Sequence, residues 1–285
     1  ADTKMDPVFY EQKLRFIHNM IFSFHIPLFF IVSAALMTRF MDSVNFNDKE
    51  FLKKITTKLL FPFFTLNFAF GVFNVLTPYS FYPTPRVKEM LIATLFMQSH
   101  HEFLPSAPLW FLFTLFFSAF VTYIFVRKIN IDKITLLIIS VLLSRAYPFF
   151  SDVDILGLRR FLYNYEFFVI GYIFSENIIN QNIKRSYLLF IMLFVAWLLP
   201  FLIQDTYGNF MHLITGISGS LLIVFLSQRL KHSVSHPVNK FICMCGQNSL
   251  LIFVFHMPAY VFVKKIIYLL GLADIYLGLF VMILL

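Results

Sequence analysis

The chain has few charged residues for its length. Asp, Glu, Lys and Arg make up 13% of its 285 residues, whereas 59% of the residues are hydrophobic and 19% are aromatic. A soluble protein of this length could not cover so much apolar surface with so few charges. The composition therefore excludes an ordinary soluble domain. It predicts an integral, multi-pass membrane protein with an all-α fold, a single bundle of transmembrane helices over residues 1–285.

Cysteine is almost absent, and this limits the chemistry available to the chain. The two thiols, Cys243 and Cys245, are too close in sequence to form an ordinary disulfide. Cys-x-Cys can begin a metal site, but no second pair of ligands follows it. His100-His101-Glu102 has the residue types of metal ligands, yet a lone cluster in a loop is usually exposed to solvent. We predict no metal site and no bound cofactor, and we place both cysteines in a loop.

Hydrophobic runs recur along the whole chain, and a helix needs about 20 such residues to cross a membrane. Pro148 ends the fourth run, and the fifth is short and carries Glu166, so these two are the weakest. We predict about nine spans, near residues 19–38, 59–77, 109–126, 134–150, 161–175, 187–203, 210–227, 248–263 and 266–285.

Basic residues are concentrated in the loops between these runs. The formal net charge is +8. Loops after odd-numbered spans carry thirteen Lys and Arg, against ten in the even-numbered loops and the starting tail together. Positive loops face the cytoplasm, so the chain starts outside and ends inside. Because the basic residues lie in short loops, where they set the orientation of the spans, we do not expect a nucleic-acid partner. Lys53, Lys54 and Lys58 in the first loop either serve orientation alone or also contact CoA phosphates or anionic lipid.

Two histidine–proline pairs mark the ends of hydrophobic spans. Phe24-His25-Ile26-Pro27 opens the first span, and Phe255-His256-Met257-Pro258 lies in the eighth. An ionisable side chain within the membrane is costly and is a candidate functional residue. Proline also frees a backbone carbonyl and kinks its helix. Each histidine is therefore a site residue, a group that bonds to the freed carbonyl, or both.

The predicted orientation places further polar residues at the same outer end. Trp110 opens the third span, where it either lines a pocket or anchors the helix at the interface. Arg159 and Arg160 in the fourth loop either bind an anionic substrate group, pair with Glu166, or are solvated loop charges. Polar groups that converge at one end of a bundle are what a membrane-embedded site requires.

Four segments of the chain, in order, resemble motifs of the membrane acyltransferase-3 family. Each motif is short, but four in sequence across nearly the whole chain form a specific pattern. The matching segments are Ser23-Phe24-His25-Ile26-Pro27-Leu28-Phe29-Phe30-Ile31-Val32-Ser33, then Leu59-Leu60-Phe61-Pro62-Phe63, then Pro108-Leu109-Trp110-Phe111-Leu112, and finally Gly246-Gln247-Asn248-Ser249-Leu250 with His256-Met257-Pro258.

The resemblance implies an enzyme of the bacterial inner membrane, a membrane O-acyltransferase. Such an enzyme moves an acetyl or other short acyl group from acyl-CoA to a sugar hydroxyl of a cell-envelope glycan or glycolipid. The donor is expected to be cytoplasmic acetyl-CoA. A neutral histidine near pH 7 suits the base that this reaction needs. Our catalytic candidates are His25 and His256, and our substrate-binding candidates are Trp110, Arg159, Arg160, Glu166, Ser33 and Asn248, the last of which can instead bond between helices.

The chain departs from the family pattern in two places. The family commonly has about ten spans, and its main catalytic histidine follows a glycine near the outer end of the first. No segment before His25 matches that helix. We therefore expect the first helix to be missing here, activity to depend on it, and His25 and His256 to support its histidine. Ser33-Ala34 also replaces the usual Ser-Gly, which can crowd a helix contact.

A transporter or flippase of lipid-linked sugars is the alternative function. It would share the aromatic-rich spans and the buried polar groups. Inverted repeats of whole spans would favour it, but the sequence shows only the two short histidine–proline pairs. A non-catalytic membrane scaffold is a third possibility.

Overall fold

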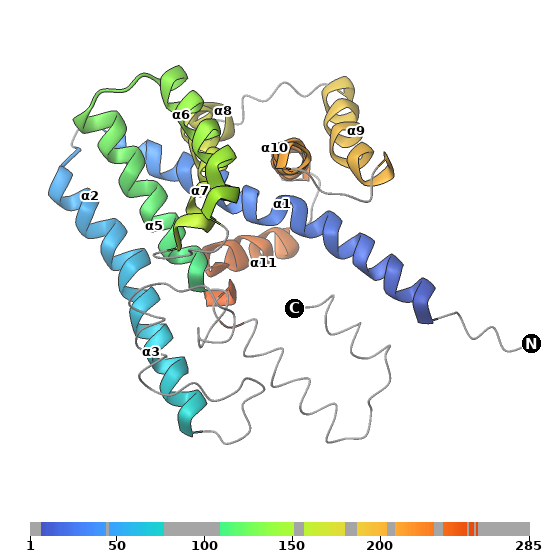
Figure 1. Ribbon diagram of the computed structural model, residues 1–285, viewed down its shortest axis with the longest axis horizontal. Helices are drawn as coiled ribbons and strands as arrows, with labels where there is room; N and C mark the ends of the chain where they lie inside the picture. The colour runs from blue at the N-terminus through green and yellow to red at the C-terminus, as the bar shows by residue number, and fades with distance from the viewer. Residues whose placement is uncertain are drawn as a thin grey trace, which may run out of the picture. The chain divides into compact units, whose positions relative to one another are not determined.

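The computed structural model describes residues 7–43, 46–76, 109–150, 157–179, 187–203, 209–230, 236–249, 251–253 and 255. In these residues all regular structure is helical and no strand occurs, which confirms the all-α prediction (Figure 1). The chain divides into two compact units. The first comprises residues 1–55, 115–153 and 158–233, and the second comprises residues 56–114, 154–157 and 234–285.

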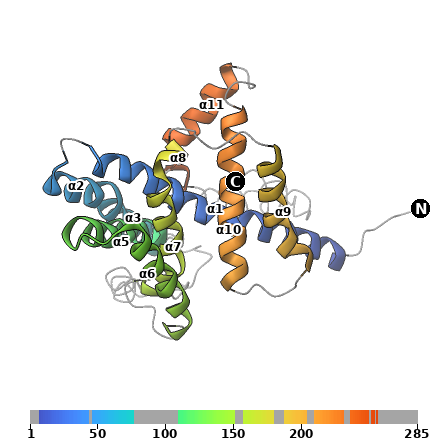
Figure 2. The ribbon, with the colours of Figure 1, turned by 90° about the horizontal axis from the view of Figure 1, so that it is seen from above.

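The first unit is built around one long helix, α1. Helices α7 and α10 both pack across α1, while α6 lies beside α7 and α9 lies beside α10 (Figures 1 and 2). Two short turns, η3 (Ile124–Lys128) and η4 (Tyr147–Phe150), follow α5 and α6. The helices of this unit are α1 (Pro7–Met41), α2 (Asp48–Ile55), most of α5 (Trp110–Tyr123), α6 (Lys133–Ala146), α7 (Leu158–Ile173), α8 (Ser175–Ile179), α9 (Tyr187–Ile203) and α10 (Asn209–Leu230).

Small residues let α1 and α7 approach closely. A Cβ added at Gly171 of α7 would overlap the carbonyl oxygen of Ile31 and lie 2.6 Å from its Cα. On α1, Ala34 and Ala35 are buried beside Ile31. Small side chains at such contacts let helix backbones pack tightly where lipid offers no hydrophobic driving force. Ala34, where the family pattern has glycine, is fully buried.

Aromatic rings and one polar pair join α5 to α7. The rings of Phe117 and Phe161 meet edge to face with centroids 4.8 Å apart. The hydroxyl groups of Thr122 and Tyr165 lie 3.2 Å apart and share a buried hydrogen bond. Edge-to-face pairs add stability beyond the area they bury, and a buried Tyr hydroxyl needs such a partner.

The second unit also packs through phenylalanine. It contains the π-helical turn η1 (Thr56–Leu60), α3 (Phe61–Leu76), the first residues of α5 and α11 (His236–Gln247). Phe63 of α3 packs against Phe113 with ring centroids 5.6 Å apart, and Phe111 packs against Phe253 at 5.1 Å. The abundant phenylalanines of the sequence therefore act as the contact residues of the helices.

Four described helical segments are long and apolar enough to cross a membrane, so the chain is an integral membrane protein. They are residues 19–41, 110–128, 133–150 and 211–229, and they coincide with the first, third, fourth and seventh predicted spans. The second, fifth and sixth predictions coincide with α3, α7 and α9. Most of the last two predicted spans lies outside the described residues.

One local prediction was wrong. Cys243 and Cys245 lie on helix α11 and not in a loop, and both are free thiols. The segment mixes polar and apolar residues over only twelve positions, so its composition resembled a loop between two spans.

Candidate functional site

His25 lies within α1, which continues through Pro27. A proline has no backbone N–H, so Pro27 cannot bond to the carbonyl of Ser23, four residues earlier. The His25 ring is half-buried and meets the ring of Phe22 edge to face, with centroids 4.5 Å apart. The histidine thus lies in the turn of α1 where Pro27 leaves one backbone hydrogen bond unmade.

Two neighbouring helices hold this weak segment by hydrogen bonds. From α9, Trp197 Nε1 donates to Ser23 Oγ at 3.1 Å, and Ser23 Oγ in turn donates to the Met20 carbonyl at 2.7 Å. From α10, Ser220 Oγ donates to the Phe24 carbonyl at 3.3 Å. The backbone on the N-terminal side of His25 is therefore fixed from two directions.

Glycines on α10 allow this close contact. A Cβ added at Gly216 would lie 2.7 Å from the ring of Phe167 and 3.0 Å from the ring of Pro27. A Cβ added at Gly219 would lie 2.7 Å from the Cβ of Phe24. The segment Phe24–Pro27 consequently fits into the crossing of α1, α7 and α10.

A buried ion pair lies between α6 and α7. Glu166 is only 2% exposed at its side chain, and its Oε2 lies 3.5 Å from Nη2 of Arg145, whose side chain is 32% exposed. Arg145 and Glu166 come from the two helices on either side of the fourth predicted loop. A charged pair with one fully buried member is costly to desolvate, so it is a candidate for a functional role or for a specific helix contact.

A row of rings lies beside this pair. The imidazole of His212 on α10 lies against the ring of Tyr163 at 4.3 Å and against the edge of Phe167 at 5.3 Å, between centroids. Tyr163 also meets Tyr147, at 5.0 Å. Since Phe167 also faces Gly216, this ring connects His212 to the crossing that holds His25.

The predicted site residues divide between the two units. His25, Ser33, Arg159, Arg160 and Glu166 belong to the first. Ser33 is half-buried on α1. The guanidinium of Arg159 lies 5.7 Å from the ring of Tyr147, and the carbonyl of Arg160 accepts a hydrogen bond from Asn164. The partner found for Glu166 is Arg145.

The second unit holds the other two described candidates. Trp110 is the first residue of α5, and its ring meets that of Phe111. Asn248 Nδ2 donates to the Met244 carbonyl at 2.8 Å, so its side chain supports the end of its own helix. His256 lies outside the described residues.

Sequence reasoning missed two residues of this site, Arg145 and His212. In the sequence, Arg145 is one of the basic residues of the predicted fourth loop, and His212 has no partner at a recognisable spacing. Both acquire partners through contacts between helices, with Glu166 and Tyr163 respectively. A charged residue at the end of a hydrophobic span, such as Arg145, was the one available signal.

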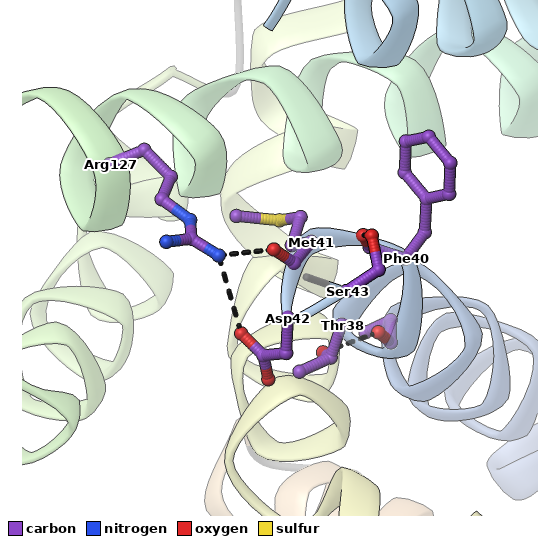
Figure 3. Close-up of polar contacts among 7 residues, drawn as sticks. Thr38, Phe40, Met41, Asp42, Ser43 and Arg127 are labelled. Carbon is purple, nitrogen blue, oxygen red and sulfur yellow. Dashed lines mark hydrogen bonds and ion pairs between the residues drawn. The ribbon is translucent and has the colours of Figure 1, made fainter. Parts of the chain in front are cut away.

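A basic residue, Arg127, binds the C-terminal end of α1 (Figure 3). Nη2 of Arg127 donates to the Met41 carbonyl and pairs with Asp42, whose carboxylate oxygen is 3.5 Å away. Next to it, Lys128 pairs with Asp48 of α2, and this hydrogen bond lowers the pKa of Asp48. Cations at a helix C-terminus complement its dipole.

Lys54, one of the first-loop lysines, lies with its ammonium 3.7 Å from the ring centroid of Phe40. This cation–π contact joins the last turn of α2 to α1.

A family model described as an acyltransferase domain matches residues 5–285. No curated protein and no solved structure shows significant similarity to the chain. The matched range includes the α1 crossing, the Arg145–Glu166 pair and the ring row.

Proposed function

Because the chain belongs to the acyltransferase-3 family and is a membrane acyltransferase, we propose that it acylates a sugar hydroxyl of a cell-envelope glycan or glycolipid. The acyl group is acetyl or another short chain, and the donor is acetyl-CoA from the cytoplasm of a bacterium whose inner membrane holds the protein. The observation that carries the proposal is the position of His25, held within the family motif by hydrogen bonds from two neighbouring helices.

The proposed reaction needs one base. A histidine accepts the proton of the sugar hydroxyl while the hydroxyl oxygen attacks the thioester carbonyl carbon. The carbon–sulfur bond then breaks, CoA leaves as a thiolate, and the thiolate takes up a proton. Neutral imidazole suits this role near pH 7. His25 is our candidate for the base or for the residue that positions it, and His256 is the second candidate.

Radioactive acetyl transfer tests the proposal. Membranes that contain the full-length protein would receive acetyl-labelled acetyl-CoA, and the extracted envelope glycans would be counted before and after mild alkali. We expect alkali-labile label in the glycan fraction. We expect its loss in His25→Ala and its retention in Leu36→Ala, a change at an exposed position on the same helix.

A different result would favour the transport alternative. If no glycan is labelled, while movement of lipid-linked sugar across the membrane depends on the protein and persists in His25→Ala, the acyl-transfer proposal is wrong.

A further inference from the structure

The Arg145–Glu166 pair and the ring row of Tyr147, Tyr163 and His212 lie beside the His25 crossing and have no role in the proton transfer described above. Helices α6, α7 and α10 and the turn η4, all in the same compact unit, contribute these residues. Glu166 and Phe167 are consecutive on α7, and Phe167 faces Gly216 and His212. The pair and the rings therefore border the crossing that holds His25.

One carboxylate oxygen of Glu166, Oε2, can accept a further hydrogen bond. Ser144 lies within hydrogen-bonding reach of the carboxylate, and Arg145 is 3.5 Å from Oε2. Among the described residues, however, no hydrogen bond reaches Oε2, although this atom is buried. Buried polar atoms without a hydrogen bond are costly and uncommon. Beside its ion pair with Arg145, Oε2 can therefore accept a hydrogen bond that none of the described residues donates.

The hydrogen-bonding properties of Glu166 and Arg145 determine which ligand group can bind to both. A carboxylate only accepts hydrogen bonds and a guanidinium only donates them, whereas a hydroxyl does both. One hydroxyl can therefore donate to Glu166 and accept from Arg145. A ligand carboxylate would be repelled by Glu166, and a ligand ammonium would be repelled by Arg145. The pair matches a neutral, hydroxyl-rich molecule.

The neighbouring rings suit the apolar face of such a molecule. Tyr147, Tyr163 and His212 are half-buried, so part of each ring remains accessible. Binding sites commonly combine an aromatic surface with a few placed polar groups. A pyranose has C–H bonds on its faces and hydroxyl groups around its edge, which fits an aromatic row beside a carboxylate–guanidinium pair.

We propose that Arg145, Glu166, Tyr163 and His212 form the subsite that binds the acceptor sugar. The inference rests on the proposed function for the word acceptor, but the binding of a neutral sugar is a separate property. Glu166 and Arg145 bind hydroxyl groups, Tyr163 and His212 pack against the ring, and another hydroxyl of the same sugar is left to reach the histidine base.

Saturation-transfer NMR on the detergent-solubilised full-length protein tests binding without any transfer step. The probes are the methyl glycosides of glucose, galactose and N-acetylglucosamine. We expect a signal on ring C–H protons from at least one glycoside. We expect Glu166→Gln to weaken its binding about tenfold, the effect of losing a hydrogen bond to a charged group.

Two further variants guard against simple misfolding. Tyr163→Leu removes a ring without disturbing the ion pair, and it should also weaken binding. Leu142→Ala alters an exposed residue one turn before Arg145 on the same helix and should leave binding unchanged. Circular dichroism and gel filtration would confirm that each variant is folded.

The outcomes separate the two proposals. Sugar binding that requires Glu166 and Tyr163, in a protein that transfers no acetyl group, supports this subsite and contradicts only the proposed reaction. Absence of binding by the wild-type protein, or equal binding by the wild type, Glu166→Gln and Tyr163→Leu, would overturn the subsite even if acetyl transfer is observed.

Discussion

At the scale of single residues, the hydroxyl of Ser220 has an effect beyond its own helix. Most serine and threonine hydroxyls of α10 bond within the helix, as Ser227 does to the Val224 carbonyl at 2.7 Å. Ser220 bonds instead to the Phe24 carbonyl on α1. That carbonyl is one residue from His25, so the bond limits where the imidazole can lie.

We predict that Ser220→Ala lowers kcat for acetyl transfer about threefold to tenfold, as expected for loss of a positioning hydrogen bond. KM for the acceptor should not change, because Ser220 does not contact the proposed sugar subsite. The midpoint of the pH–rate profile should shift, since the surroundings of the base change. Steady-state kinetics over a pH series would measure all three quantities.

Ser227→Ala is the matched control, because it removes a hydroxyl from the same helix without breaking a contact with α1. Equal kinetics for both variants would show that Ser220 has no part in positioning His25.

At the scale of elements, the contact between α1 and α7 depends on the missing side chain at Gly171. We predict that Gly171→Ala destabilises the protein by about 1–3 kcal/mol, the usual cost of overpacking a tight contact. Gly246→Ala on α11 is the matched change, because nothing lies within 4 Å of a Cβ there. It should be neutral, or stabilising by up to about 1 kcal/mol through higher helix propensity.

Denaturant unfolding in detergent, followed by circular dichroism, would give both free energies of unfolding. If Gly171→Ala is as stable as Gly246→Ala, the close approach of α1 and α7 does not require a glycine at position 171.

The start of α6 depends on a titratable cap. Asp132 accepts hydrogen bonds from the backbone N–H and the hydroxyl of Thr135, and these bonds lower the pKa of Asp132. Because the folded-state pKa is depressed, the stabilisation is present above the unfolded pKa near 3.8. It is lost as the pH falls through the lower, folded-state pKa.

We therefore predict that the wild-type protein loses more thermal stability between pH 6 and pH 3 than Asp132→Asn does. An asparagine still caps the helix, but it does not titrate. Melting curves in detergent at several pH values would show the difference, and parallel curves for the two proteins would contradict it.

Elements were easier to predict than the contacts between them. Long apolar runs revealed α1, α5, α6 and α10, because a span needs only local composition. Helix α11 was missed because it is short and mixed in character. Arg145, Glu166 and His212 meet through the packing of three helices, and a single sequence does not encode those distances in any local pattern.

His25 was the exception, since the motif Phe-His-x-Pro is local. Even there, the sequence did not indicate that Trp197 and Ser220 would hold the segment, because these residues lie far along the chain. The site was therefore predictable only where its residues are neighbours in sequence.

At the scale of the whole molecule, labelling of a single cysteine can show how the chain is oriented in the membrane. Cys243 is an exposed, free thiol on α11, and the charge distribution predicts that this segment faces the cytoplasm. We predict that a membrane-impermeant maleimide labels Cys243 of the Cys245→Ser variant in inverted vesicles and not in intact cells. Labelling in intact cells would reverse the predicted orientation.

The contact of Arg127 with the end of α1 also has a mechanical consequence. A guanidinium stays charged at any physiological pH, so this attachment does not depend on cellular conditions. With its end held by Arg127 and its middle held by Trp197 and Ser220, α1 cannot slide along its own axis. The segment of α1 that carries His25 is therefore held in one register against its neighbouring helices.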